Sequence, residues 1–144
     1  MVNQQNTRIA KILAPISVSG GATATCTELD TVLNGVKADY AEIYVFTGAV
    51  GANGVATLKI QETDTSGSGQ ADVSGGGFTA LVDADDGIFL KAQIDLRKRK
   101  RYLNMVIING ATNASVLCAF AILGRLGETP DTNTERGVQE LLSL

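Results

Sequence analysis

Alternation of apolar and polar residues is the strongest constraint that this sequence places on its fold. The segment IFLKAQIDL alternates over its whole length, with one side formed by Ile88, Leu90, Ala92, Ile94 and Leu96. A period of two is that of a β-strand, whose successive side chains point to opposite faces. The segments AEIYVFTG (41–48) and VATLKIQE (55–62) alternate in the same way. All three predict strands with one buried face.

Two later segments, LNMVIIN (103–109) and SVLCAFAIL (115–123), are apolar on both faces. Such runs favour central strands that are covered on both sides, by the chain itself or by a partner subunit. A buried helix is the rival interpretation for 115–123, but the run is short and its flanks resemble turns. We therefore expect both segments to be central strands.

Turn-forming segments divide the chain into short pieces. They are GAVGANG (48–54), DTSGSGQ (64–70), SGGG (74–77), DADDG (83–87) and NGATNAS (109–115). Between them we expect about eight strands, near residues 8–18, 22–29, 40–47, 55–62, 78–82, 88–96, 101–109 and 115–124. Many short strands at this spacing predict an all-β sandwich or barrel.

The length of 144 residues fits one domain. We expect a β-sandwich domain over residues 1–124, with residues 1–7 as an N-terminal arm, and a C-terminal arm over 125–144. Thr134 is a candidate cap for a short helix whose apolar stripe is Val138, Leu141 and Leu142. This stripe is too small for a core of its own, so we expect it to dock on the domain or on a neighbouring subunit; a frayed terminus is the alternative.

The sequence offers no constellation of catalytic residues. Histidine is absent, which removes the commonest acid/base group and metal ligand. The segment GAVGANG lacks the Lys-Ser/Thr of a phosphate loop, and DADDG lacks the closing glutamate of a calcium loop. We therefore expect no enzyme and no catalytic, cofactor-binding or metal-binding residues.

Charge and cysteine content restrict the partners. The net charge of −3 argues against general nucleic-acid binding, and no apolar run reaches the length of a membrane helix. Cys26 and Cys118 both lie in strand-like segments, where we expect buried free thiols; the sequence leaves a disulfide between them open.

Five consecutive basic residues, Arg97, Lys98, Arg99, Lys100 and Arg101, interrupt this acidic chain. They lie between two predicted strands, so the first interpretation is the solvated rim of a hairpin. In a strand, the three arginines would point together, away from the two lysines. The second interpretation is contact with an acidic protein surface on a neighbouring subunit or a scaffold, and direct nucleic-acid contact comes third because no aromatic residues are interleaved.

Three stretches together resemble the small virion proteins encoded in tailed-phage head gene clusters. They are TELDTVLNGVKADYAEIYVFTGAV, LKIQETDTSGSG and IDLRKRKRYLNMVIINGATNASVLCAFAILG. In those proteins a Leu-Asp-Thr segment precedes a strand, an L-Q-E-[ST]-D-like strand end precedes a Gly/Ser turn, and a basic-Arg-Tyr-Leu strand precedes an apolar strand ending in Leu-Gly. The matching positions are 29–31, 60–64, 101–103 and 123–124, with Ile60 where the motif has Leu.

The resemblance covers residues 22–124 and implies a capsid decoration, or cement, protein with a jelly-roll-like sandwich. It implies a homo-oligomer, typically a trimer, that is made in the host cytoplasm and binds the major capsid protein on the outside of the virion. The basic run 97–101 and the stripe Val138, Leu141 and Leu142 are then the expected interface residues. The alternative is a tail-fibre or baseplate sandwich that binds carbohydrate or a receptor, although three Tyr, four Phe and no Trp are few for sugar stacking.

Overall fold

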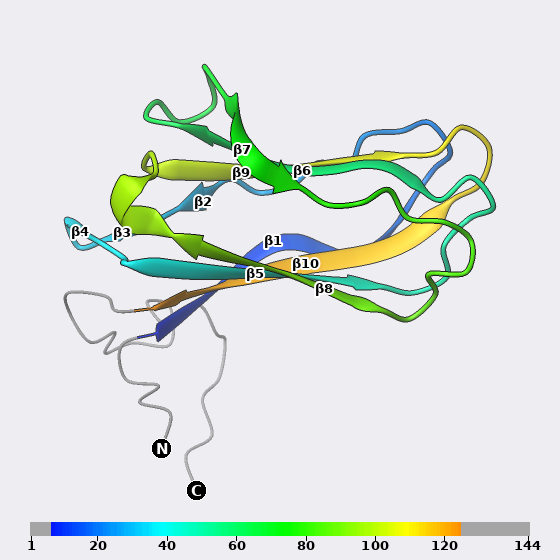
Figure 1. The fold of residues 1–144 in the computed structure, drawn as a ribbon, viewed down its shortest axis with the longest axis horizontal. Helices are drawn as coiled ribbons and strands as arrows, with labels where there is room; N and C mark the ends of the chain where they lie inside the picture. Colours follow the sequence, from blue (N-terminus) through cyan, green and yellow to red (C-terminus); the bar gives the residue numbers. More distant parts are fainter. Residues whose placement is uncertain (1–6, 125–144) are drawn as a thin grey trace, which may run out of the picture.

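Two four-stranded antiparallel sheets face each other in this chain, as a computed structural model of residues 7–124 shows (Figure 1). Sheet A has the order β1 (Thr7–Val18), β10 (Ser115–Gly124), β5 (Tyr40–Thr47) and β8 (Phe89–Asp95). Sheet B has the order β2 (Leu29–Asp30), β9 (Tyr102–Asn109), β6 (Val55–Thr63) and β7 (Ala71–Gly77). A small hairpin of β3 (Val32–Leu33) and β4 (Val36–Lys37) lies between β2 and β5 in the chain.

The order of these strands is that of a jelly roll. Among the eight strands of the two sheets, only β6 and β7 are joined within one sheet; every other connection crosses from one sheet to the other. Eight antiparallel strands arranged as two interleaved Greek keys define this fold. The expected all-β, jelly-roll-like sandwich is thus confirmed, with β3 and β4 as an additional hairpin.

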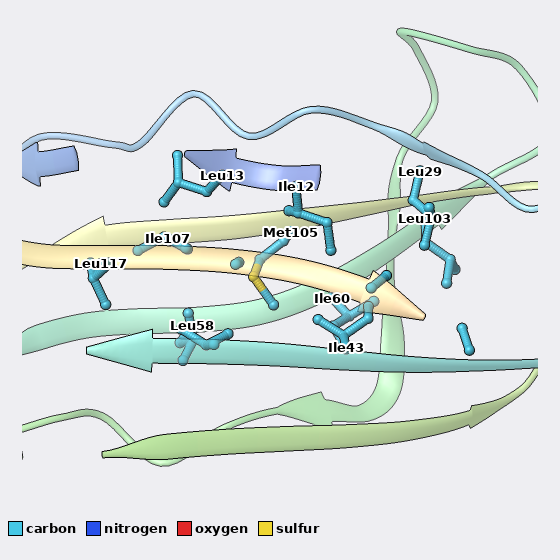
Figure 2. Packing of buried hydrophobic residues seen from close by; sticks show 14 of the residues in the cluster. Ile12, Leu13, Leu29, Ile43, Leu58, Ile60, Leu103, Met105, Ile107 and Leu117 are labelled. Atoms are coloured by element: carbon cyan, nitrogen blue, oxygen red, sulfur yellow. The ribbon is translucent and has the colours of Figure 1, made fainter. Parts of the chain in front are cut away.

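The core lies between the sheets and consists of the inward side of each alternating segment (Figure 2). Ile43 and Leu117 from sheet A and Leu58 and Ile107 from sheet B are each at most 2% exposed. In β8 the predicted inward residues pack against this core, while the residues between them are exposed. The alternation therefore orients β8 as the sequence predicted.

The two apolar runs form central strands, also as predicted. In sheet B, β9 lies between β2 and β6, and in sheet A, β10 lies between β1 and β5 (Figure 1). The inward side of β10 is buried, whereas its outward side is only partly covered within residues 7–124. The apolar character of that outward side therefore has no explanation in the core.

Two predicted strands are wrong in position. Residues 78–82 form no strand, apart from a single bridge between Val55 and Leu81, and the predicted turn 74–77 lies inside β7. The pairing of β6 with β7 skips a stretch of β7 that includes Gly75, whose φ of 74° is left-handed. Glycine permits this conformation, so the strand bulges here instead of turning.

The predicted strand 22–29 is largely irregular. Thr23 makes one bridge to Ile108, and regular pairing with β9 begins only at Leu29. Ala24 N–H donates to the carbonyl of Ile107 at 2.9 Å, so the segment follows β9 without a continuous ladder. Of the expected arms, Thr7 already belongs to β1, and the remaining arm residues, including Val138, Leu141 and Leu142, lie outside the described residues.

Candidate interaction surfaces

The basic run connects the two sheets at one end of the sandwich. It begins in the 3-10 helix η2 (Leu96–Lys98), which leads from β8 in sheet A to β9 in sheet B. Leu96 is fully buried and anchors this turn, and the carboxylate of Asp95 accepts the N–H of Arg97 at 3.1 Å. The predicted hairpin rim is therefore wrong, because the flanking strands belong to different sheets.

Each arginine of the run meets a different acidic side chain. The paired atoms are Arg97 Nη2 and Asp95 Oδ2 at 2.6 Å, Arg99 Nη1 and Glu62 Oε1 at 3.5 Å, and Arg101 Nη2 and Asp30 Oδ2 at 2.7 Å. The expected alternation of the run does not apply, because it starts as a helical turn. Lys98 and Lys100 have no ion pair with any side chain of residues 7–124.

Two of these acidic partners, Asp95 and Asp30, have a lowered pKa. The side-chain hydrogen bonds of Arg97, together with its backbone N–H, lower the pKa of Asp95 to about 2. Burial raises the pKa of Asp30, but hydrogen bonds from Arg101 and from the Val32 N–H outweigh it, and the net shift is downward. The arginines are thus paired within the domain, and Lys98 and Lys100 are the cations of the run that form no ion pair with a side chain of residues 7–124.

The acidic turn DADDG is structural. Asp86 accepts the N–H of Val50 at 2.6 Å, and Asp85 accepts the N–H of Val82 at 2.8 Å. These bonds close the turn before β8, as turn-forming aspartates do. Within residues 7–124, no three Cys, Asp or Glu side chains group in a way that would hold a metal ion. The same residues include no helix long and apolar enough to span a membrane.

The outer face of sheet A carries most of the aromatic residues. Five of the chain's seven aromatic side chains project from it, namely Tyr40, Tyr44, Phe46, Phe89 and Phe120. On one rung of the sheet, the Phe46 and Phe89 rings stack with centroids 4.5 Å apart. On the next rung, Tyr44 and Phe120 stack at 5.2 Å. These four residues are named the aromatic patch.

The aromatic patch is open to solvent at Phe46 and Phe89, whereas Tyr44 and Phe120 are half-buried. Phe89 is 66% exposed and Phe46 is 37% exposed, and Val116 beside them is 38% exposed. Sequence reasoning missed this surface, because its residues come from three separated segments. The available signal was the outward side of AEIYVFTG and SVLCAFAIL, where aromatic or aliphatic residues stand in place of polar ones.

A groove lies on the same face, at the end where β1 begins and β10 ends. It is lined by residues of all four strands, among them Ile9, Tyr40, Glu42, Gln93, Ile122 and Gly124. Glu42 forms its polar side: its carboxylate accepts hydrogen bonds from Lys91, Gln93 and Tyr44, which lower its pKa to about 2. This hollow is named the terminal groove.

The two cysteines are free thiols in different surroundings. Cys26 packs against the core, and burial raises the pKa of its thiol to about 11. Cys118 is on the outer face of sheet A, opposite Phe46 in the pairing of β10 with β5. The expectation of free thiols is confirmed, but both are half-buried rather than buried.

Comparison with known proteins adds no relative. No family model matches this sequence. No curated protein matches it either.

Proposed function

We propose that this chain is a structural virion protein that binds the outside of a tailed-phage head and stabilises it as a cement protein. The proposal starts from the sequence resemblance over residues 22–124. The single observation that supports it best is the exposed aromatic patch on a rigid sandwich. Jelly rolls occur in capsid proteins and in lectins, so the fold alone does not decide the function.

The aromatic patch has the properties of an adhesive surface. Contiguous exposed apolar residues mark interaction sites on soluble proteins, and aromatic side chains contribute most of the binding energy in many interfaces. The patch consists of two stacked ring pairs, and aromatic side chains lose little conformational entropy on contact. A shell offers many equivalent positions, so avidity amplifies individually weak contacts.

In this proposal the chain forms a homotrimer and contacts the major capsid protein. The aromatic patch mediates contact between copies, and the unpaired Lys98 and Lys100 face acidic residues of the shell. Arg97, Arg99 and Arg101 form ion pairs with acidic side chains of the same domain. In this proposal they therefore stabilise the turn between the sheets and do not bind the shell.

The first experiment measures the mass of the purified chain by size exclusion with light scattering. A trimer of the 15.0 kDa chain has a mass of 3 × 15.0 = 45.0 kDa. A stable 15.0 kDa monomer at all concentrations would contradict the self-association part of the proposal.

The second experiment tests shell binding by co-sedimentation with heads of the encoding phage that were assembled without this chain. We expect saturable binding, and release of the chain by Lys98→Glu combined with Lys100→Glu. The matched control is Lys59→Glu on the outer face of sheet B, which should bind normally. Absence of the chain from the pellet would contradict the function.

A tail-fibre or baseplate module that binds carbohydrate or a receptor is the second candidate. The observation in its favour is the exposed ring of Phe89, because exposed aromatic rings stack on sugars. A glycan array distinguishes the two functions. Specific glycan binding that Phe89→Ser abolishes, without shell binding, would favour the second candidate.

A further inference from the structure

The terminal groove lies where the described chain ends. Thr7 and Gly124 are paired across the β1 and β10 strands, and both line the groove. Residue 125 therefore follows directly from the groove's rim. Residues 125–144 are tethered at this point of sheet A, whereas the outer face of sheet B is on the opposite side of the sandwich.

The groove presents apolar surface that nothing in residues 7–124 covers. Ile9 is 41% exposed, and it lies opposite Ile122 in the pairing of β1 with β10. The hollow has a volume of about 750 Å³, which accommodates several aliphatic side chains. Its lining is partly aliphatic, with Ile9, Ile94 and Ile122, and partly polar, with Glu42, Gln93 and Asp95.

The C-terminal segment contains a matching apolar stripe. Val138, Leu141 and Leu142 are spaced three and four residues apart, which places them on one side of a helix. Three such residues cannot form a core alone, so a helix over 134–144 needs an apolar surface to pack on. The stripe thus needs an apolar surface to pack on, and the groove has apolar surface that residues 7–124 leave uncovered.

Length permits the contact. An 11-residue helix is about 16 Å long at 1.5 Å per residue. The four strands of sheet A span about 14 Å at ~4.8 Å between neighbours. The connecting residues 125–133 reach up to ~30 Å when extended, so the helix can lie across the groove in the chain that carries it.

Charge favours the same placement. Lys11 is the next outward residue after Ile9 on β1, is exposed, and has no ion pair with any side chain of residues 7–124. Glu135 borders the apolar stripe on a helix that begins at 134. With the stripe in the groove, this carboxylate lies on a flank of the helix from which it can meet the Lys11 ammonium.

We propose that residues 134–144 pack as a short helix in the terminal groove of their own chain, with Val138, Leu141 and Leu142 against Ile9 and Ile122. The tether favours this intramolecular contact, because a short linker gives an effective concentration of the order of millimolar. Phe46 and Phe89 of the aromatic patch lie farther along the same face and do not line the groove. This inference concerns the isolated chain and does not depend on shell binding.

Disulfide trapping tests the contact directly. In a Cys26→Ser, Cys118→Ser background, Ile9→Cys is combined with Leu141→Cys and the protein is oxidised. We expect a cross-link within one chain, seen as a monomer whose mass is lower by two hydrogen atoms and whose two thiols no longer react with maleimide until the protein is reduced. The control combines Leu141→Cys with Lys59→Cys on the outer face of sheet B, and should remain reduced.

Two outcomes overturn the proposal. Cross-links between chains would show that the segment occupies a neighbour's groove or a surface formed by two copies. Equal cross-linking in the Lys59→Cys control would show contact without a defined place. These cross-linking experiments use only the purified chain. A result that contradicts the helix placement therefore does not decide the outcome of the head-binding experiment.

A labelling experiment keeps the proposal testable if the double-cysteine protein does not fold. Here Ile9→Cys alone is labelled with a maleimide in the same background. Leu141→Ser with Leu142→Ser should raise the labelling rate at least about tenfold, because the groove becomes open. Gln139→Ser lies off the stripe and should leave the rate unchanged. Equal rates in all three proteins would contradict the proposal.

Discussion

The outer faces of the two sheets differ in character although their inner faces are alike. The outer side of sheet A holds two stacked aromatic pairs and the terminal groove. The outer side of β6 in sheet B holds Thr57, Lys59 and Gln61, and the last two contact Asp72 of β7. Both sheets bury comparable aliphatic residues between them (Figure 2).

This difference distinguishes residues that are needed for folding, on the inner faces, from residues available for binding, on the outer face of sheet A. A sandwich needs one apolar face on each sheet, and the second face of an exposed sheet is ordinarily polar, as on β6 of sheet B. Sheet A departs from that rule at Tyr44 and Phe46 of β5, along β10, and at Phe89 of β8. Because the inner face already supplies the core, the apolar outer face is available for contact with another surface.

The largest expected effect is on the free energy of unfolding, and it compares the inward and outward sides of β10. Leu117 faces the core and is 1% exposed, whereas its neighbour Val116 faces outward. Leu117→Ala should lower the free energy of unfolding by about 2–5 kcal/mol, as other buried leucines do. Urea denaturation of the monomeric protein measures this change.

The matched variant is Val116→Ala on the outward side of the same strand. It should change the free energy of unfolding by less than about 1 kcal/mol, because no core contact is lost. A loss as large as that of Leu117→Ala would mean that the outer face belongs to a second core, which would remove the contrast between the sheets.

A smaller effect concerns association. Phe89→Ser on sheet A should raise the dissociation constant for self-association at least about tenfold, because an exposed aromatic anchor is removed. Val106→Ser, on the outer side of β9 in sheet B, is the control and should leave association within about twofold of the original. Analytical ultracentrifugation over a concentration series measures both.

The opposite pattern would reverse the assignment of the two faces. Association that is insensitive to Phe89→Ser but weakened by Val106→Ser would identify sheet B as the contact surface. Both variants should unfold in the same urea range as the original chain, which separates loss of contact from loss of fold.

The smallest effect is a pH dependence. Hydrogen bonds from Lys91, Gln93 and Tyr44 hold the pKa of Glu42 at about 2, below its ordinary value of 4.5. Since the folded-state pKa is the lower one, this carboxylate stabilises the fold above pH 4.5, and the contribution is lost as the pH falls toward 2. Solvent screening keeps it below about 1 kcal/mol.

Glu42→Gln should therefore be less stable than the original chain at neutral pH and equally stable near pH 2. Asp72→Asn on sheet B should show the same direction, because Lys59 and Gln61 lower the pKa of Asp72. Urea titrations across this pH range measure the differences. A Glu42→Gln effect that grows toward low pH would contradict the proposed role of its contacts.

Strand identity was predictable from the sequence because it depends on local alternation. The inward side of β8 and the central positions of β9 and β10 follow from the residue pattern alone. The bulge in β7 did not, because Gly75 and its neighbours have turn composition and only the pairing with β6 keeps them in the sheet.

The interaction surfaces were harder to predict from the sequence, because they depend on pairing between distant segments. Phe46 meets Phe89, and Tyr44 meets Phe120, only through the register of β5 with its two neighbours. The basic run was misassigned for the same reason: strands that are consecutive in the sequence were taken as a hairpin, although the jelly roll places them in opposite sheets.

The central claim is that the aromatic side of sheet A makes contact with other molecules, and Cys118 on that side is a natural probe of it. Maleimide labelling of the unaltered chain, followed by mass spectrometry, reports Cys118 directly, with the core-packed Cys26 as the internal reference. We predict that labelling of Cys118 slows as the protein concentration rises and slows further on shells. A rate for Cys118 that stays constant at every concentration and on shells would contradict the account.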